Sequence, residues 1–350
     1  MSALLAIPMN TTMCCVKGCN VFENKTQITA HSTAAVLPIK MWNKLQCPRT
    51  ELELLFTLCG GQCFRWRKSG NNEWTGVFGK RVWILSQDES NILYKVVTSS
   101  QQQTKGRKRK LEKEPLAKTT NKHGDDDLSV EREILREYFR LDVALEQHYA
   151  QWSSQDPHFK SAAVKFKGVR ILAQDPVENV FSFICSSNNN IARISSMVEK
   201  LCSLYGQQIA EVDGTMYYDF PPVEALTGTS VEKKLREAGF GYRAKYIHQS
   251  ACRIMEMGGV GAKVADCICL MSLGHLESIP VDTHIYQVAA HNYLPHLRGR
   301  KTVTDKMYTE IGDHFRTLYG PLAGWAHTIL FCADLKMFQE DTPAKKKKKA

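Results

Sequence analysis

The stretch M-G-G-V-G-A-K-V-A-D-C-I-C-L-M-S-L-G-H-L-E-S-I-P-V-D-T-H, residues 257–284, decides the fold. It opens with a glycine-rich turn and continues into an apolar stretch that predicts a helix over 263–273. Consecutive backbone N–H groups at the N-terminus of a helix bind phosphate without a cation. The turn, through Gly259 and Gly261, is therefore either a contact for a nucleic acid backbone or a plain connection between two helices.

Lys263 falls in the first turn of the predicted helix. The helix dipole disfavours a cation there, which favours the neutral amine that a nucleophilic lysine requires. Cys267 at i+4 and Met271 at i+8 lie on the same helix face. Asp266 at i+3 offers an alternative, a surface ion pair that would contribute well under about 1 kcal/mol.

Pro280 and Asp282 mark the start of another helix, nineteen residues after Lys263, with Asp282 as its N-cap. The Asp282 carboxylate serves only as this cap unless the chain folds back toward Lys263. If the chain does fold back, the carboxylate can stabilise positive charge on a sugar ring or take part in proton transfer. His284 lies at the same helix start, in position for a phosphate.

The rest of the chain predicts an α+β fold, a small β-containing domain followed by a helical body. Trp42–Val97 is rich in strand-forming residues, and Trp74–Leu85 reads as a hairpin that turns at Gly79-Lys80. Apolar spacing predicts helices after Asp125 and at 177–184, 191–201, 242–257, 263–273, 283–291, 304–318 and 325–334. The expected apolar stripe of the helix at 242–257 is Tyr246, Ile247, Ile254 and Met255. We divide the chain into a loosely ordered segment 1–40, a β-containing domain 41–150 with a basic disordered insertion at 98–124, a helical body 151–338 and a basic tail 339–350.

The net charge of +10 is confined to two segments of the 350-residue chain. Residues 101–122 hold eight Lys or Arg and two Glu, residues 341–350 hold five Lys and one Asp, and the remainder is formally neutral. Basic segments suit nucleic acid binding, nuclear import or solubility. The runs at 105–110 and 345–349 favour the nucleus, and a mitochondrial pool stays open. No run approaches the 18 or so apolar residues of a membrane span, so we expect no membrane partner.

Twelve cysteines occur without a single C-x-x-C pair. Cys14, Cys15 and Cys19 form a cluster of three, one short of the four ligands of a tetrahedral metal site. We interpret the cysteines as reduced thiols that mostly fill the core, and we expect no metal.

Taken together, these motifs resemble the helix-hairpin-helix superfamily of DNA glycosylases, and within it the eukaryotic 8-oxoguanine DNA glycosylases, which are also β-lyases at abasic sites. The resemblance runs from about Leu52 to Leu335. It is carried by G-Q-C-F-R-W (61–66), F-S-F-I-C-S-S-N-N-N-I-A-R (181–193), G-Y-R-A-K-Y (241–246), K-V-A-D-C-I-C-L-M (263–271), P-V-D-T-H (280–284) and G-W-A-H-T-I-L-F (324–331). It implies a TBP-like antiparallel N-terminal domain ahead of a helix-hairpin-helix body.

The resemblance implies a role for each matched residue. Lys263 would attack C1′ of the damaged nucleotide and hold the sugar as a Schiff base, assisted by Asp282. Phe331 and Cys267 would sandwich the flipped base, Met271 would line its pocket, and the Gly61 carbonyl would accept the N7–H that 8-oxoguanine has and guanine lacks. The residues implied to contact DNA are Asn188 in the vacated stack, Tyr242 as a wedge, Arg193 and Arg243 at the orphaned cytosine, Gly259 and Gly261 of the hairpin, and His284. The implied partner is double-stranded DNA that pairs 8-oxoguanine with cytosine, bound by a monomer without a cofactor.

Two features depart from the family. His327 stands where the family has a Gln that contacts the Watson–Crick edge of the flipped base, and imidazole lacks the fixed donor and acceptor of an amide. Lys263 follows Arg243 by only twenty positions, where the family has additional helical sequence on the order of 20–30 residues, about two average helices. The helix that begins near Tyr242 must replace the missing first helix of the motif or leave a hole in the body.

Three functions are compatible with this sequence. The first is excision of 8-oxoguanine followed by β-elimination. The second is a catalytically impaired DNA-binding or damage-sensing protein that lacks the helical segment before the hairpin. The third is a non-catalytic interaction protein that uses only the basic segments. Joint retention of Lys263, Cys267, Asp282 and Phe331 favours the enzyme.

Overall fold

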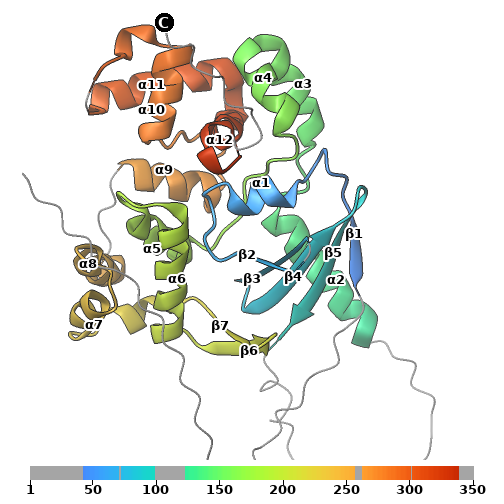
Figure 1. The fold of residues 1–350 in the computed structure, drawn as a ribbon, viewed down its shortest axis with the longest axis vertical. Helices are drawn as coiled ribbons and strands as arrows, with labels where there is room; N and C mark the ends of the chain where they lie inside the picture. Colours follow the sequence, from blue (N-terminus) through green and yellow to red (C-terminus); the bar gives the residue numbers. More distant parts are fainter. Residues whose placement is uncertain (1–41, 71, 99–122, 257–261, 301, 339–350) are drawn as a thin grey trace, which may run out of the picture. The chain divides into compact units, whose positions relative to one another are not determined.

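A computed structural model describes residues 42–70, 72–98, 123–256, 262–300 and 302–338. These residues belong to a single compact unit, Met41–Ala350. An antiparallel sheet forms its N-terminal part, and a helical body follows, as predicted (Figure 1). The division of these residues into a β-containing domain and a helical body at residue 150 stays a prediction.

The sheet has the strand order β1-β5-β4-β3-β2, with every neighbour antiparallel. Its strands are β1 (Asn43–Gln46), β2 (Arg67–Ser69), β3 (Glu73–Phe78), β4 (Arg81–Gln87) and β5 (Asn91–Val97). Gly79 and Lys80 join β3 to β4 with φ of 57° and 59°, the positive pair that a type I′ turn requires. The predicted hairpin is therefore confirmed. The buried face packs Trp83, Leu85 and Tyr94 against helix α2 (His123–Tyr138).

All of the predicted helices are present. They are α2, α5 (Pro176–Ser186), α6 (Ile191–Tyr205), α8 (Arg243–Glu256), α9 (Ala262–Met271), α10 (Thr283–Asn292), α11 (Asp305–Tyr319) and α12 (Ala323–Asp334). Further elements were not predicted: α1 (Leu54–Cys59), α3 (Leu145–Gln155), α4 (Pro157–Lys165), α7 (Val231–Glu237), the 3₁₀ turn η2 (Val223–Leu226) and the hairpin β6 (Gln208–Val212) with β7 (Thr215–Tyr218). Among the described residues, no helix combines the length and apolarity that a membrane crossing needs.

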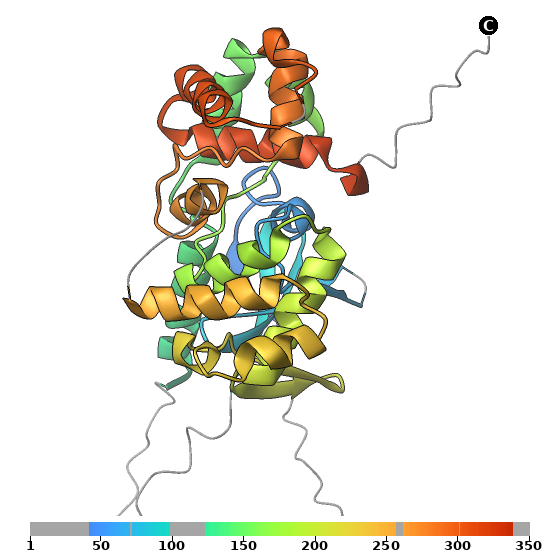
Figure 2. The ribbon, with the colours of Figure 1, turned by 90° about the vertical axis from the view of Figure 1, so that its left-hand side faces the viewer.

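The helices on either side of the short connection, α8 and α9, pack on a common neighbour. α8 packs against α5, α7 and η2, and α9 also packs against α5, so both helices contact the same helix (Figures 1 and 2). Ala244, Ile247 and Ala251 of α8 join Cys267 and Leu270 of α9 in one apolar cluster. The helical body thus keeps a continuous core on both sides of the short connection. The hairpin residues 257–261 lie outside the described residues.

The apolar face of α8 differs from the expected one. Ile247 is fully buried, but the adjacent Tyr246 is 54% exposed, so its expected place in the buried stripe is wrong. Successive helical residues point about 100° apart, and the buried stripe uses the small residues Ala244 and Ala251 instead. The side chains of Ile254 and Met255, the other expected stripe members, lie outside the described residues.

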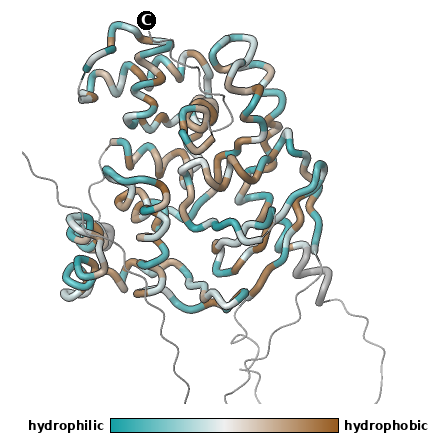
Figure 3. Tube along the Cα trace, in the orientation of Figure 1, coloured by the Kyte–Doolittle hydropathy of each residue, from teal (hydrophilic) through white to brown (hydrophobic). Residues whose placement is uncertain are grey.

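Helix α12 runs through the middle of the helical body, and nine of its twelve residues are buried. It is hydrophobic along most of its length and packs against α4, α10 and α11 (Figure 3). Gly324 permits this packing, because a Cβ there would lie 2.3 Å from the Ser278 carbonyl oxygen and 2.5 Å from Leu270 Cδ1 of α9. One turn later, α12 carries a buried histidine, His327.

Candidate active site

Helix α9 presents Lys263 on the face that also buries Cys267 and Met271, as their spacing predicted. Lys263 is half-buried, and its Nζ lies 4.6 Å from the ring centroid of Phe183 on α5. Among the described residues, Lys263 makes no ion pair, and Asp266 accepts a hydrogen bond from the Tyr308 hydroxyl at 2.6 Å. The alternative of a Lys263–Asp266 surface pair is therefore not what the structure contains.

Asp282 caps helix α10, because its Oδ1 accepts a hydrogen bond from Ile285 N at 2.9 Å. The predicted cap is confirmed. Tyr308 of α11 holds this helix start close to α9: its hydroxyl donates to Asp266 and accepts from Val281 N at 3.3 Å. One side chain thus connects the lysine-bearing helix to the residue that precedes Asp282.

Two buried groups, Cys267 and His327, lie within electrostatic reach of both Lys263 and Asp282. Burial raises the pKa of the Cys267 thiol to about 11, while Lys263 lowers it and Asp282 raises it. Burial lowers the pKa of His327 to about 4, and Asp282 opposes this shift whereas Lys263 adds to it. Since charge interactions weaken with distance, the amine and the carboxylate both act on the same two buried side chains, next to the Tyr308 bridge between α9 and the start of α10.

His327 is buried without a hydrogen bond to either ring nitrogen among the described residues. The carbonyls of Pro280 and Gly324 lie close enough to favour a proton on the ring, but neither accepts a bond of ordinary geometry. A neutral imidazole carries one donor and one acceptor. An unpartnered buried polar group is costly, so this ring is suited to a ligand that supplies its hydrogen bonds.

Gly61 and the ring of Phe331 are in close contact. Gly61 has φ of 76°, and a Cβ there would lie 3.2 Å from Phe331 Cε1, so only glycine fits. The neighbouring Gln62 carbonyl accepts from Gln174 Nε2 at 2.7 Å, and Gln174 N donates to the Met271 carbonyl at 2.8 Å. This chain of hydrogen bonds fixes the Gly61 loop relative to the end of α9.

His284 lies in the first turn of α10, as the sequence placed it. Its Nδ1 is 2.7 Å from Asp334 Oδ2 at the end of α12, and its ring meets Phe331 edge-on with centroids 5.6 Å apart. His284 is therefore oriented by a carboxylate on one side and an aromatic ring on the other, and its side chain remains 43% exposed.

A second cluster surrounds the turn between α5 and α6. Asn188 is exposed with φ of 47°. The preceding Ser187 carbonyl accepts from Tyr242 Oη at 3.0 Å and from Arg243 Nε at 3.1 Å, and Arg243 Nη2 also donates to the Asn188 carbonyl at 3.1 Å. Arg243 is 3% exposed, so its guanidinium supports the turn, whereas Arg193 is exposed. Gly259 and Gly261 lie outside the described residues.

Several residues of the site were not anticipated. Tyr308 and Asp334 act through contacts between segments far apart in the chain, and no local pattern indicates them. Gln62 could have been found, because it belongs to the quoted motif G-Q-C-F-R-W and is 1% exposed. A buried glutamine with a satisfied amide indicates a fixed loop.

Two family models match the chain in succession. The 8-oxoguanine DNA glycosylase N-terminal domain matches residues 44–180, and the HhH-GPD superfamily of base excision DNA repair proteins matches residues 181–310. The sheet, the helical body and the lysine-bearing helix are thus those of a helix-hairpin-helix base excision repair protein.

Curated relatives and solved structures narrow this class. The chain is 34% identical over 322 residues to the N-glycosylase/DNA lyase OGG1 of Arabidopsis thaliana, with 84% of this chain and 80% of the relative covered. It is 35% identical over 350 residues to the N-glycosylase/DNA lyase of Saccharomyces cerevisiae, with 84% and 86% covered. The Clostridium acetobutylicum 8-oxoguanine glycosylase/lyase, solved with DNA containing cytosine opposite 8-oxoguanine, aligns with a TM-score of 0.63 at 26% identity, covering 84% of this chain and 97% of that one. The chain belongs to the 8-oxoguanine DNA glycosylase family.

Proposed function

We propose that this chain is a bifunctional DNA glycosylase and β-lyase that excises 8-oxoguanine opposite cytosine during base excision repair. The observation that carries the proposal is the Tyr308 bridge, whose hydroxyl bonds to Asp266 on the helix of Lys263 and to Val281 N, next to Asp282. Cys267 and His327 lie within electrostatic reach of both Lys263 and Asp282. The names of the curated relatives, and the DNA bound by the solved Clostridium relative, support the substrate class.

In this proposal Lys263 is the nucleophile. Its amine, after losing a proton, forms a bond to C1′ of the damaged nucleotide as the bond to the base breaks. Opening of the sugar ring converts this adduct to a Schiff base, loss of a C2′ proton then expels the 3′ phosphate, and water releases Lys263. The Asp282 carboxylate stabilises the positive charge that develops on the sugar.

The flipped base would lie between Cys267 and Phe331, with Met271 along its edge. The Gly61 carbonyl would accept N7–H of 8-oxoguanine and would repel the N7 lone pair of guanine. His327, neutral because burial lowers its pKa to about 4, would meet the Watson–Crick edge with one donor and one acceptor.

The turn at Asn188 would enter the gap that the flipped base leaves, with Tyr242 as the wedge beside it. Arg193 and Arg243 would contact the orphaned cytosine, and Arg243 would have to exchange the carbonyls of Ser187 and Asn188 for the base. The amides of Gly259 and Gly261, together with His284, would hold phosphates. We further propose that the protein acts as a monomer in the nucleus, directed there by its two basic segments.

An excision assay with the full chain tests the proposal. A duplex with 8-oxoguanine opposite cytosine is labelled at the 5′ end of the damaged strand. Cleavage after alkali reports base excision, and cleavage without alkali reports the lyase step. We expect both products from the chain as it stands, neither from Lys263→Gln, and both from Lys160→Gln, which removes an exposed lysine on α4.

The alternative of a catalytically impaired DNA-binding protein makes a different prediction in the same assay. The short connection between α8 and α9 is the feature that favours it. A chain that unfolds cooperatively and binds the damaged duplex, yet releases no base, would establish the alternative and refute the enzyme.

A further inference from the structure

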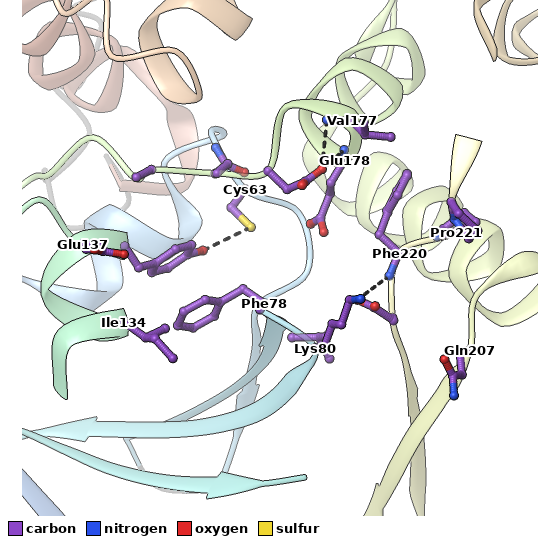
Figure 4. Close-up of a pocket in the computed structure, with 18 of the residues that line it drawn as sticks. Cys63, Phe78, Lys80, Ile134, Glu137, Val177, Glu178, Gln207, Phe220 and Pro221 are labelled. Carbon is purple, nitrogen blue, oxygen red and sulfur yellow. Dashed lines mark hydrogen bonds between the residues drawn. The ribbon is translucent and has the colours of Figure 1, made fainter. Parts of the chain in front are cut away.

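A cavity of about 600 Å³ is lined by Gln174, which supports the Gly61 loop, but by none of the residues proposed to contact DNA or the flipped base. The β3–β4 turn, the end of α2, the start of α5 and the segment Asp219–Val223 enclose it (Figure 4). Its volume falls within the range typical of small-molecule sites, roughly 300–1,000 Å³.

One wall of the cavity is a stack of aromatic rings. Phe78 stacks on Tyr138 with centroids 3.9 Å apart and on Trp83 at 4.7 Å. The Tyr138 hydroxyl accepts from Trp66 Nε1 at 2.9 Å and donates to Cys63 Sγ at 3.7 Å, which fixes the wall. A rigid aromatic face of this kind attracts cations as well as apolar groups.

The cavity lining carries an excess of carboxylates. The lining contains one lysine, Lys80, and four acidic residues: Glu137, Asp175, Glu178 and Asp219. Asp175 caps α5 and Asp219 accepts from Phe220 N, so the backbone already satisfies part of their capacity. Glu178 differs from Asp175 and Asp219, because its carboxylate points into the cavity and accepts no hydrogen bond from the backbone among the described residues.

Glu178 points from α5 into the cavity (Figure 4). Among the described residues its carboxylate accepts one hydrogen bond, from Arg65 Nη1 at 3.4 Å. That distance is long for a bond between charged groups, which is usually about 2.7–2.9 Å. An ionised carboxylate has about four acceptor sites, so a further donor can bind here.

We propose that this cavity binds a small organic cation with an apolar body, its charge against Glu178 and its body along the wall of Phe78 and Tyr138. Charge selects the cation over an anion, because four carboxylates line the space. The stacked rings favour an aryl or alkyl body over a bare metal ion, and the described residues contain no group of three or more His, Cys, Asp or Glu side chains that could hold a metal.

Glu178 also makes the expected binding depend on pH. Burial raises its pKa to about 7; Arg65 lowers it, and Asp175 and Asp219 raise it. Cys63, Lys80, Glu137 and Tyr138 line the same space. A cation favours the ionised carboxylate, so bound cation lowers the pKa of Glu178. Affinity therefore rises with pH on passing through about 7.

The test uses the full chain and three probes of similar shape: 2-phenylethylammonium, the neutral 2-phenylethanol and the anionic phenylacetate. Calorimetry measures affinity, and amide chemical shifts locate the bound probe. We expect saturable binding of the ammonium probe with shifts around the cavity, and binding of the alcohol weaker by about tenfold, the ratio that corresponds to a charge-assisted hydrogen bond. The ammonium probe should bind more tightly at pH 8 than at pH 6.

Glu178→Gln should weaken the ammonium probe by about tenfold, whereas Glu237→Gln, at the exposed end of α7, should leave its affinity unchanged. If Glu178→Gln fails to fold, the comparison of the three probes on the unaltered chain decides. The proposal would be overturned if phenylacetate or the alcohol bound as tightly as the ammonium probe. It would also be overturned if the amide shifts lay away from the cavity, or if binding of the ammonium probe did not saturate. Base excision plays no part in these measurements, so their outcome is independent of the proposed function.

Discussion

Replacing His327 by Gln should change how the stability of the protein depends on pH. Burial lowers the pKa of His327 to about 4, against an ordinary histidine value of 6.5. Between these values the unfolded chain binds a proton that the folded chain lacks, so His327 makes the fold less stable as the pH falls from 6.5 toward 4. The full pKa difference corresponds to about 3 kcal/mol.

The magnitude must be measured as a difference between two proteins, because Glu178 acts in the opposite direction. Its folded pKa is raised to about 7 from 4.5, so its contribution to stability falls as the pH rises through this window. In the unaltered chain the two effects partly cancel. Subtracting the unfolding free energy of His327→Gln removes the Glu178 contribution, which both proteins share.

The assay is urea unfolding of both proteins from pH 4.5 to 7.5. Relative to the unaltered chain, His327→Gln should gain up to about 3 kcal/mol as the pH falls across this range. His291→Gln, which removes an exposed ring, tests whether the effect belongs to the buried histidine. A free-energy difference between the unaltered chain and His327→Gln that stays constant with pH would refute the reasoning.

Three further substitutions test the packing around the site. Tyr308→Phe removes the two hydrogen bonds that join α9 to the start of α10 and should lower the unfolding free energy by about 1–3 kcal/mol; equal loss in Tyr246→Phe, which alters an exposed ring, would contradict this. Gly324→Ala places a Cβ 2.3 Å from a backbone oxygen and should cost more than about 2 kcal/mol in urea unfolding, whereas Gly228→Ala meets nothing closer than 3.6 Å and should be near neutral. Arg243→Met frees the carbonyls of the α5–α6 turn and should lower the melting temperature; an unchanged melt would show that the buried guanidinium does not support that turn.

Local signals were enough to predict much of the fold. Gly79-Lys80 specifies its hairpin because a type I′ turn needs two residues that tolerate positive φ. Asp282 caps its helix because a short carboxylate reaches the backbone amides of the first turn. The hairpin of β6 and β7 was predictable by the same reasoning, since Asp213-Gly214 at its turn has φ of 49° and 73°. The Asp156-Pro157 start of α4 is another such signal.

The parts that could not be predicted depend on contacts between distant segments. The spacing of Lys263, Cys267 and Met271 indicates a shared face, but nothing near Asp282 indicates that Tyr308 will hold the two helices together. Tyr246 reads as apolar and is expected on the buried face of its helix, yet it is exposed, and the buried stripe of α8 contains Ala244, Ile247 and Ala251. Arg243 reads as a surface residue until the carbonyls of the α5–α6 turn are seen to surround it.

Borohydride trapping tests the central claim most directly. The full chain is incubated with a duplex that pairs 8-oxoguanine with cytosine, and the reductant converts any imine between enzyme and sugar into a stable covalent bond. We predict a cross-linked species that Lys160→Gln also forms, and peptide mapping should place the sugar on Lys263. A cross-link that persists in Lys263→Gln, or a folded, DNA-bound chain that forms none, would contradict the account.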